Sequence, residues 1–507
     1  MRMHVLVLFL ALIFIGDARI PASGNLAHIS IDSAPAASAA PSGFRLLIDN
    51  GDAIASRIHW IDRARKTIDL QYYIFEADVT GNLVAQHLLA AADRGVRVRI
   101  LLDDLRAQDG DTLFVALDAH ARIEVRKFNP FLTHDPSWLT RVGQFVVDGR
   151  RLNRRMHNKS FVVDDKAAII GGRNIGDAYF DAGDDVHFRD LDVLALGPIV
   201  QQISKAFDIY WNDAAAHPLR APGSDTGDQT ALARLRAQFA APSDAQTSAA
   251  MRHLSQQMRE DATQQWYWGA AQILVDKPGK VEPEQTDRDA RTSLRMAEQL
   301  KAKLAAAQHQ VLLVSPYFIP GEGDLNFFRT LTQRGIDLKL LTNSLAATDE
   351  PLVFAGYSRY RLPMLQQGAV LYELRPQTGR PQATARGTSS GVSLHAKVFV
   401  IDLRYVYVGS MNLDHRSEVL NTELGVMVDS PAFAAALANY FDRATMPNTA
   451  FSLALDPPGP NSETIRWSWV GANGEKLADR SDPEVPAWRR AQISVLRVVS
   501  RPLEGLL

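Results

Sequence analysis

Three things are scarce in this chain of 507 residues: cysteine, net charge and long apolar runs. Cysteine is absent, which excludes disulfide bonds, zinc–thiolate sites and a cysteine-linked lipid anchor. The formal net charge is only −2, whereas proteins that bind nucleic acid without sequence preference carry a broad basic surface. The charge balance therefore argues against a general nuclease, although it is compatible with a local basic groove.

The strongest apolar run, from Val5 to Ile15, is too short for an ordinary transmembrane helix, which needs about 20 residues. Arg2 precedes the run and small residues follow it, which is typical of a signal peptide. We expect residues 1–24 to be a signal peptide or an uncleaved membrane anchor. Residues 25–43, rich in Ala, Ser and Pro, are predicted to be a flexible linker. The protein would then lie in the cell envelope, either periplasmic or attached to the membrane.

The chain contains one cluster of residues twice. In each copy, histidine, lysine, aspartate, glycine and asparagine follow one another at the same spacing. The first copy is His157, Lys159, Asp164, Gly171, Gly172 and Asn174, and the second is His395, Lys397, Asp402, Gly409, Ser410 and Asn412. A lone His-x-Lys on a strand is usually part of a solvated surface, but this repetition is too specific to arise by chance. The duplication predicts a functional site.

Each copy predicts a β-hairpin, because an apolar run ends at the aspartate and a second apolar run returns toward the glycines. Side chains alternate faces along a strand, so the histidine and lysine of each copy share one face. Tight turns centred on Asp165–Lys166 and on Leu403–Arg404 predict that each asparagine lies opposite its histidine, and the glycines allow the backbone to approach an anion. Although Asp164 and Asp402 belong to the predicted catalytic cluster, they point away from that face. We expect them to support the hairpins.

Two such hairpins supply the groups that phosphodiester transfer requires. One neutral histidine attacks phosphorus to form a phosphohistidine, while the other donates a proton to the leaving oxygen, and the roles reverse when the acceptor enters. We expect His157 to be the nucleophile and His395 the general acid. Two ammonium and two carboxamide groups would bind the phosphate oxygens, so no metal or cofactor is required. These groups belong to Lys159, Lys397, Asn174 and Asn412.

A carboxylate is expected beside the histidines, because the two lysines lower both histidine pKa values. Glu423 begins a strand-like segment after the second motif, and the matching segment of the first half begins at Asp190. Asp190 and Glu423 are therefore candidate partners of the histidines. A salt bridge or a strand-end charge is the alternative for both. Asp192 lies on the same strand face as Asp190 and stays a candidate too.

The repeat extends beyond the motifs. Residues 67–75 predict a strand, followed by a helical stretch and a second strand at 94–102. Residues 310–318 and 334–341 repeat this order. We therefore expect an α/β fold of two similar halves, each a mixed β-sheet flanked by helices, related by a pseudo-two-fold axis and sharing one active site.

The predicted halves span residues 44–213 and 263–455. A helical linker at 214–262 would join them, and a C-terminal extension at 456–507 would follow. The end of that extension is rich in arginine and apolar residues, and we expect a helix docked on the domain, with a position at a membrane interface as the alternative.

Two further groups of side chains are candidates for substrate contacts. Arginines just before the first motif are predicted to attract an anionic headgroup or membrane surface, with a solvated strand edge as the alternative; they are Arg150, Arg151, Arg154 and Arg155. Aromatic residues at the repeated strands would line a lipid cleft or, as the alternative, pack in the core; they are Tyr72, Tyr73, Tyr317 and Phe318.

In its two motifs the chain resembles the phospholipase D superfamily, whose HKD motif both copies match. The resemblance covers most of the chain and implies two α/β halves that build a single site and act through a phosphohistidine without a metal. The first copy departs from the pattern in carrying Gly172, where serine is commoner. Residues 151–160, 171–180, 342–349 and 420–425 are similar to bacterial cardiolipin synthases, particularly the type that takes phosphatidylglycerol and phosphatidylethanolamine.

This resemblance implies a phosphatidyltransferase that moves a phosphatidyl group to the hydroxyl of phosphatidylglycerol. The alternative is a phospholipase D hydrolase, or a phosphodiesterase or nuclease, that uses water as the acceptor. A membrane-associated binding protein with an inactive site is disfavoured by two intact motifs. The expected partners are phosphatidylglycerol, with phosphatidylethanolamine as a second candidate, and a membrane surface, but no nucleic acid.

Overall fold

The computed structural model of the protein describes residues 40–104, 111–131, 148–183, 187–219, 228–241, 265–282, 295–376, 391–501 and 504–506. The predicted signal peptide or anchor, most of the predicted linker at 25–43 and much of the segment 214–262 lie outside these residues. Within the described ranges, no helix is both long and apolar enough to cross a membrane.

The first half alternates strands and helices before its hairpin, as the repeat predicts. Its elements are β1 (Ser42–Leu47), α2 (Asn50–Arg63), β2 (Thr67–Tyr72), α3 (Val79–Asp93), β3 (Arg97–Asp103), α4 (Asp111–Asp118), β4 (Ile123–Phe128), β5 (Ser160–Val163), β6 (Ala167–Gly171), η1 (Asp177–Tyr179), β7 (His187–Arg189), β8 (Asp192–Leu196), α6 (Pro198–Trp211) and β9 (Ala216–Pro218). Helix α7 (Gln229–Ala240) follows and packs beside α4.

The second half repeats this order. Its elements are β10 (Tyr267–Val275), η2 (Pro278–Val281), α10 (Met296–Ala305), β11 (Gln310–Val314), α11 (Gly321–Gln333), β12 (Asp337–Asn343), α12 (Pro351–Tyr357), α13 (Arg361–Gln366), β13 (Val370–Leu374), β14 (Val392–Leu394), β15 (Val398–Ile401), β16 (Tyr405–Gly409), η3 (Arg416–Leu420), β17 (Leu424–Asp429), α14 (Pro431–Ala444) and β18 (Ala450–Leu455). The C-terminal extension adds β19 (Ile465–Val470), β20 (Lys476–Asp479), α15 (Ala487–Ser500) and η4 (Glu504–Leu506).

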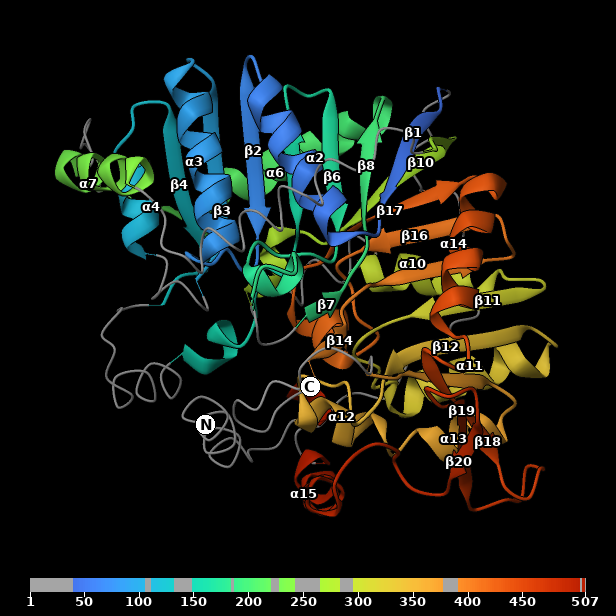
Figure 1. The fold of residues 1–507 in the computed structure, drawn as a ribbon. Coiled ribbons are helices and arrows are strands. Elements are labelled where there is room, and N and C mark those ends of the chain that lie inside the picture. Colours follow the sequence, from blue (N-terminus) through green and yellow to red (C-terminus); the bar gives the residue numbers. More distant parts are fainter. Residues whose placement is uncertain are drawn as a thin grey trace.

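Strand pairing makes the repeat visible in space (Figure 1). The strand order of the first half is β9-β4-β3-β2-β5-β6-β8-β1. The order of the second half is β18-β13-β12-β11-β15-β16-β17-β10, which matches the first position by position. Strands β1 and β10 are antiparallel neighbours where the halves meet. The predicted fold of two similar halves is therefore confirmed, with the pseudo-two-fold axis between β1 and β10.

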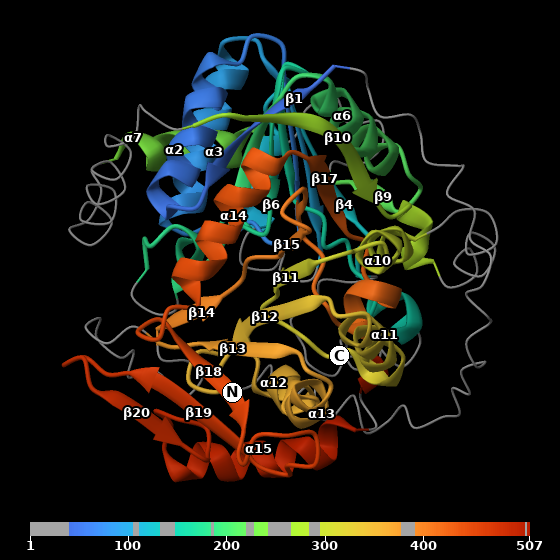
Figure 2. The same ribbon diagram turned by 90° about the vertical axis from the view of Figure 1, so that its right-hand side faces the viewer.

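Most of the buried apolar side chains belong to three large cores. Helices α2 and α3 cover the outer face of the first sheet, and α11 to α13 cover the outer face of the second (Figures 1 and 2). A third core lies between the sheets and joins the two hairpins, with Val162 and Ile170 from one and Val398 and Val408 from the other. Burial on both faces explains why the hairpin strands are continuously apolar, without polar alternation.

The hairpin turns differ from the prediction by one residue. Ser160 pairs with Ile170 and Val398 with Val408, so three residues lie between the strands of each hairpin. Hydrogen bonds from Lys166 N–H to Val163 and from Arg404 N–H to Ile401 make Asp164–Asp165 and Asp402–Leu403 the central residues of the tight turns. These four central residues all have positive φ, between 50° and 54°. Such a turn leaves one extra residue before the strands pair, which shifts the register. The strands also end before the asparagines, so the predicted pairing of each asparagine opposite its histidine is wrong.

The C-terminal extension packs on the second half. Strands β19 and β20 continue its sheet beyond β18, and α15 lies against α12 with Ile493 buried in the core (Figure 2). The other side of α15 is apolar and faces solvent, with Trp488 57%, Val495 65% and Val498 73% exposed. The helix is therefore docked, but only by one face.

Candidate active site

The two motifs are brought together by short parallel contacts between the halves. Strand β7, which precedes Asp190, pairs with β14, which precedes His395, at the centre of the molecule (Figure 1). An equivalent isolated bridge joins Met156, just before His157, to Thr422, just before Glu423. Each histidine therefore lies next to the carboxylate of the other half.

His157 and Glu423 form the first of these pairs. The Nδ1 atom of His157 lies 2.9 Å from Oε2 of Glu423, and both side chains are buried. The hydroxyl of Ser410 donates to the same carboxylate over 2.5 Å. Tyr73 packs edge-on against the His157 ring, with ring centroids 5.0 Å apart. Because Nδ1 is occupied, Nε2 is the nitrogen left for chemistry.

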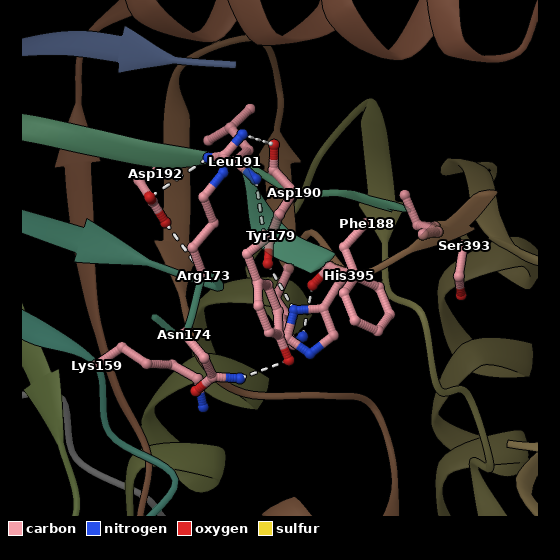
Figure 3. Close-up of polar contacts among 12 residues, drawn as sticks. Lys159, Arg173, Asn174, Tyr179, Phe188, Asp190, Leu191, Asp192, Ser393 and His395 are labelled. Carbon is pink, nitrogen blue, oxygen red and sulfur yellow. Dashed lines mark hydrogen bonds and ion pairs between the residues drawn. The ribbon is translucent and has the colours of Figure 1, made fainter. Parts of the chain in front are cut away.

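His395 and Asp190 form the second pair (Figure 3). The Nδ1 atom of His395 lies 2.5 Å from Oδ2 of Asp190. Tyr179 and Phe188 flank the His395 ring at centroid distances of 5.2 and 5.0 Å. Asn174 of the first motif donates from Nδ2 to the Tyr179 hydroxyl over 2.7 Å, so the first motif reaches the second histidine through one aromatic ring.

Both lysines lie in the site and are almost fully buried. Lys159 donates to the backbone carbonyl of His157 over 2.6 Å, and Lys397 donates to that of His395. Burial lowers the pKa of Lys159 well below its usual range and that of Lys397 to about 8, although Glu423 and Asp190 raise both. Lys397 also lowers the pKa of Lys159, so an anionic ligand beside them would stabilise the charged form of both lysines.

The asparagines occupy different environments. Oδ1 of Asn174 accepts from the backbone N–H of Ile74 over 3.2 Å, which fixes its carboxamide. Oδ1 of Asn412 is buried and accepts no hydrogen bond within the part of the chain that the structure describes. A buried acceptor without a partner is costly, and a substrate hydroxyl would satisfy it.

The glycines are required by the carboxylates. A Cβ at Gly172 would lie 2.2 Å from Oδ1 of Asp190, and one at Gly171 would lie 2.2 Å from Oδ1 of Asp192. The glycines are predicted to let the backbone approach an external anion. In the structure they instead let it approach the carboxylates of Asp190 and Asp192. Ser410 fits at the position equivalent to Gly172 and hydrogen-bonds the longer Glu423.

Burial and charge set the protonation of the two pairs. Burial lowers the pKa of both histidines and the two lysines lower it further, to about 4 for His395. Burial raises the pKa of Glu423 to about 7, against the effects of Lys159 and Ser410. Burial also raises the pKa of Asp190, but His395, Lys397 and Arg173 outweigh it and hold that pKa below its usual range. The two carboxylates therefore differ in charge near neutral pH.

The aspartates of the motifs lie outside the site. Asp164 accepts from the backbone N–H groups of Arg65, Lys66 and Thr67. Asp402 accepts from those of Gln308, His309 and Gln310 in the same way. Each carboxylate ties the tip of its hairpin to the start of a neighbouring strand, as expected from the direction in which it points, and neither contacts a histidine.

The predicted arginine cluster does not act as one surface. Arg155 is fully buried and pairs with Asp103 over 2.8 Å, so its role is structural. Arg151 pairs with Asp148, and Arg154 donates to the backbone of Lys280. Arg150 is exposed. The prediction that these arginines together attract an anionic headgroup is wrong for Arg155, which cannot reach solvent.

The remaining candidates divide between site and core. Tyr73 contacts His157, and Tyr317 donates to Asp349 over 2.7 Å close to Ser393. Tyr72 and Phe318 are core residues, as in the alternative interpretation. Asp192 pairs with Arg57 and Arg173 and contacts neither histidine.

Sequence reasoning missed Tyr179 and Phe188, whose contacts with His395 depend on the packing of one half on the other. Among the described residues, no group of three or more His, Asp or Glu is arranged to hold a metal ion.

A family model described as "Cardiolipin synthase, PLD-like domain" matches residues 58–211 and 300–445, more than half of the chain. Cardiolipin synthase C of Escherichia coli (strain K12) is 37% identical over 470 residues, covering 90% of this chain and 94% of that protein. Cardiolipin synthase A of Pseudomonas entomophila (strain L48) is 26% identical over 409 residues, covering 79% and 68%.

Among solved structures, phosphatidylserine synthase of Haemophilus influenzae Rd KW20 superimposes with a TM-score of 0.57. The match covers 92% of this chain and 95% of that one, at 12% sequence identity. Similarity at this identity concerns the fold alone.

Proposed function

This chain belongs to the phospholipase D superfamily, in the family of the cardiolipin synthase PLD-like domain, and from that premise we propose how its residues act. It is a cardiolipin synthase-like phosphatidyltransferase, similar to cardiolipin synthase C. The acceptor would be the hydroxyl of phosphatidylglycerol, and the reaction would pass through a phosphohistidine. The observation that carries this proposal is the pair of crossed histidine–carboxylate contacts, which turn two repeats into one site.

His157 is proposed as the nucleophile. Its partner Glu423 has a pKa raised to about 7 and is therefore partly neutral, so it does little to hold a proton on the His157 ring. Nε2 of the neutral ring attacks phosphorus as the bond from phosphorus to the leaving oxygen breaks. The phosphatidyl group is then carried on His157.

His395 is proposed as the general acid and base. Its partner Asp190 stays ionised, because its pKa is below the usual range, and an ionised carboxylate stabilises the imidazolium. In the free site the His395 pKa is about 4. A bound phosphodiester adds negative charge opposite the lysines and so raises the His395 pKa above that value. His395 gives its proton to the leaving oxygen and later takes one from the acceptor hydroxyl, as the bond between phosphorus and His157 breaks.

Lys159, Lys397 and Asn174 are proposed to hold the non-bridging phosphate oxygens. The lysines are buried beside the histidines, where charge on the transition state is stabilised more strongly than in water. Asn412 has a buried carboxamide oxygen with no partner in the described chain, and we assign it to the hydroxyl of the acceptor. An acceptor with several hydroxyls, such as the glycerol headgroup of phosphatidylglycerol, suits such a contact.

The exposed face of α15 is proposed to rest on a phospholipid bilayer. Trp488, Val495 and Val498 form an apolar stripe on this face, and the exposed Arg501 follows at its end. The chain then reaches Leu506, whose carbonyl accepts from Arg416, and Arg416 is close enough to lower the pKa of His157. An exposed apolar stripe with an arginine at its end favours contact with an anionic membrane, and this helix leads toward the rim of the site. A location at the membrane of the cell envelope would follow.

Lipid mass spectrometry tests the reaction. Membranes carrying the full chain are incubated with phosphatidylglycerol, with and without phosphatidylethanolamine, and the His157→Ala variant is the control. Cardiolipin that forms only with active protein supports the transferase, and a requirement for phosphatidylethanolamine identifies it as the donor. Phosphatidic acid without cardiolipin would show that water is the acceptor and would overturn the proposal.

Vesicle sedimentation tests the membrane surface. The full chain should bind vesicles of phosphatidylglycerol more tightly than vesicles of phosphatidylcholine, and Val495→Asp with Val498→Asp should weaken binding about tenfold or more. Ile209→Asp, which changes another exposed apolar residue on α6, is the matched control and should bind as before. Equal binding by the double variant and the control would exclude α15 as the docking surface.

A further inference from the structure

The two halves differ at one place where the repeat predicts that they match. The repeat aligns His157 with His395, and α6 and α14 both begin at a proline directly after equivalent strands. Near the ends of β3, β4 and α6 and just before His157, the first half carries Leu101, Phe128, Met156, Phe207, Tyr210 and Trp211. The aligned residues of the second half are Leu341, Leu374, Leu394, Tyr440, Arg443 and Ala444.

In the first half these six residues form a closed apolar core. All six are buried, and Val281 of η2 packs among them. In the second half the aligned six residues line a cavity of about 600 Å³. The change from Trp211 to Ala444 and from Phe128 to Leu374 removes much of the filling volume, and the change from Tyr210 to Arg443 adds a cation. The cavity therefore exists because large side chains of the first half have smaller counterparts in the second.

The cavity wall combines apolar side chains with charged groups of both signs. Leu46 and Ile48 line it together with Arg189 and Arg443, and the residue of the second half that aligns with Arg189 is the uncharged Thr422. Within the described residues, the Arg443 side chain makes no hydrogen bond or ion pair. A volume of this size is typical of small-molecule sites.

The carboxylates that also line the cavity are already engaged. Asp49 caps α2 by accepting from the backbone N–H groups of Gly51 and Asp52. Asp181 contacts His187 over 2.8 Å, and Asp190 contacts His395. Arg443 is therefore the cation that the cavity offers to a ligand, and a planar guanidinium matches phosphate oxygens in a two-bond geometry.

The cavity shares a wall with the catalytic site. The two-stranded ribbon of β7 and β14 separates them: Leu394 lines the cavity, and the next residue is His395. Phe188 and Asp190 line the cavity and also contact the His395 ring (Figure 3). Arg173 ties this wall together by donating to the carbonyls of Leu47, Ile48 and Asp190.

We propose that this cavity is a second binding site, distinct from the site between the two motifs, for a ligand that carries an anionic phosphate group next to an apolar part. The ligand would sit behind the β7–β14 ribbon, with its phosphate at Arg443. This inference goes beyond the transfer reaction, because the site would exist whether the acceptor of the phosphatidyl group is a lipid or water. It also predicts that ligand binding affects only one of the two histidines directly.

Calorimetric titration of the full chain tests the proposal. The His157→Ala variant is used as the parent to prevent turnover, and dihexanoyl phosphatidylglycerol is the probe. Ala444→Trp restores the side chain that fills the first half and should remove one binding site. Arg443→Gln keeps the volume and should weaken that site about tenfold or more, because a charge-assisted hydrogen bond is lost. Arg466→Gln, at an exposed position on β19, is the matched control and should bind like the parent.

Two further probes identify the source of the phosphate. Binding of sn-glycero-3-phosphoglycerol at the same site would assign it to a water-soluble phosphate ester, and binding of the dihexanoyl lipid alone would assign it to a phospholipid. Leu374→Phe, copied from Phe128, is the second filling variant should Ala444→Trp fail to fold. Unchanged site number and affinity in the filling variants and in Arg443→Gln would overturn the proposal. Equal binding of zwitterionic dihexanoyl phosphatidylcholine, insensitive to Arg443→Gln, would overturn it as well.

Discussion

The two halves of the molecule carry the same histidine, lysine and asparagine but hold them with different partners. His157 contacts Glu423, whose carboxylate accepts a hydrogen bond from the Ser410 hydroxyl. His395 contacts Asp190, which packs against Gly172, a residue with no hydroxyl to donate. Ser410 fits beside Glu423 and donates to it, whereas a Cβ at Gly172 would clash with Asp190. Two copies of one motif have thus become two different proton environments, which a sequential reaction with distinct nucleophile and acid can use.

Replacing each histidine is the strongest test of this difference. His157→Ala and His395→Ala should each lower transfer by about 10⁴-fold or more, because each removes a group that acts at the reacting phosphorus. With a p-nitrophenyl phosphodiester, whose leaving group departs without a proton, only His395→Ala should still form the covalent intermediate. Rapid quenching at alkaline pH followed by peptide mass spectrometry would detect phosphohistidine at His157.

The same experiment can reverse the assignment. Phosphohistidine at position 395 in the His157→Ala variant would show that the two roles are exchanged. Phosphohistidine forming on both histidines at equal rates would remove the distinction between the halves. Persisting transfer in both variants would exclude the paired-site mechanism altogether.

The next largest effects are expected from replacing Asp190 and Glu423, and the two replacements should lower the transfer rate by different amounts. Asp190→Asn should lower kcat by about 10²–10³-fold, because His395 loses the anion that stabilises its protonated form. Glu423→Gln should cost tenfold or less at pH 6, since Glu423, with a pKa of about 7, is already mostly neutral there. The cost should grow above pH 7, where the native carboxylate is ionised. Steady-state transfer rates between pH 6 and 8.5 measure both, and a larger loss for Glu423→Gln at pH 6 would contradict this asymmetry.

The sequence predicts the repeat, the hairpins and the candidate carboxylates, because these depend on local patterns of alternation and on alignment of one half with the other. It does not predict that the carboxylates cross between the halves. Asp190 and His395 are 205 positions apart, and His157 and Glu423 are 266 apart. Their pairing follows from the parallel bridges β7–β14 and Met156–Thr422, which form only when the halves dock.

The turn and the arginines show a second limit of the sequence. The register shift arises from positive φ at both central residues of each turn. Aspartate tolerates this conformation, but nothing in the sequence predicts it for Leu403. Likewise, four arginines within six positions of the sequence predict a basic surface cluster. Arg155 is nevertheless buried, because it pairs with Asp103, whose carboxylate is buried at the end of β3. A run of charged residues in the sequence therefore does not show which of their side chains lie on the surface, because that depends on the fold of the backbone.

A smaller effect is expected from the residues beside the carboxylates. Gly172→Ala places a Cβ 2.2 Å from Asp190 and should displace it from His395, lowering kcat about 10²-fold. Ser410→Ala removes one hydrogen bond to Glu423 and should cost about fivefold, the equivalent of about 1 kcal/mol. Gly323→Ala, where a Cβ meets no atom within 4 Å, is the control for adding a methyl group. Equal losses at Gly172 and Ser410 would show that the two carboxylates are equally tolerant.

The smallest expected effect concerns stability, and its sign separates the halves. The folded pKa of Glu423 is raised to about 7, so its favourable contribution is complete below the unfolded value and is lost as pH rises through 7. Glu423→Gln escapes that loss and should stabilise the protein at pH 8, on the order of 2 kcal/mol, with little change near pH 4.5. The folded pKa of Asp190 is lowered, so its contribution is present above the unfolded value and is lost as pH falls. Asp190→Asn should therefore destabilise the protein at pH 8, and thermal unfolding midpoints of the two variants should move in opposite directions there. Shifts of the same sign would mean that both carboxylates carry the same charge in the folded protein, and the distinction between nucleophile and acid would then have to come from the bound substrate.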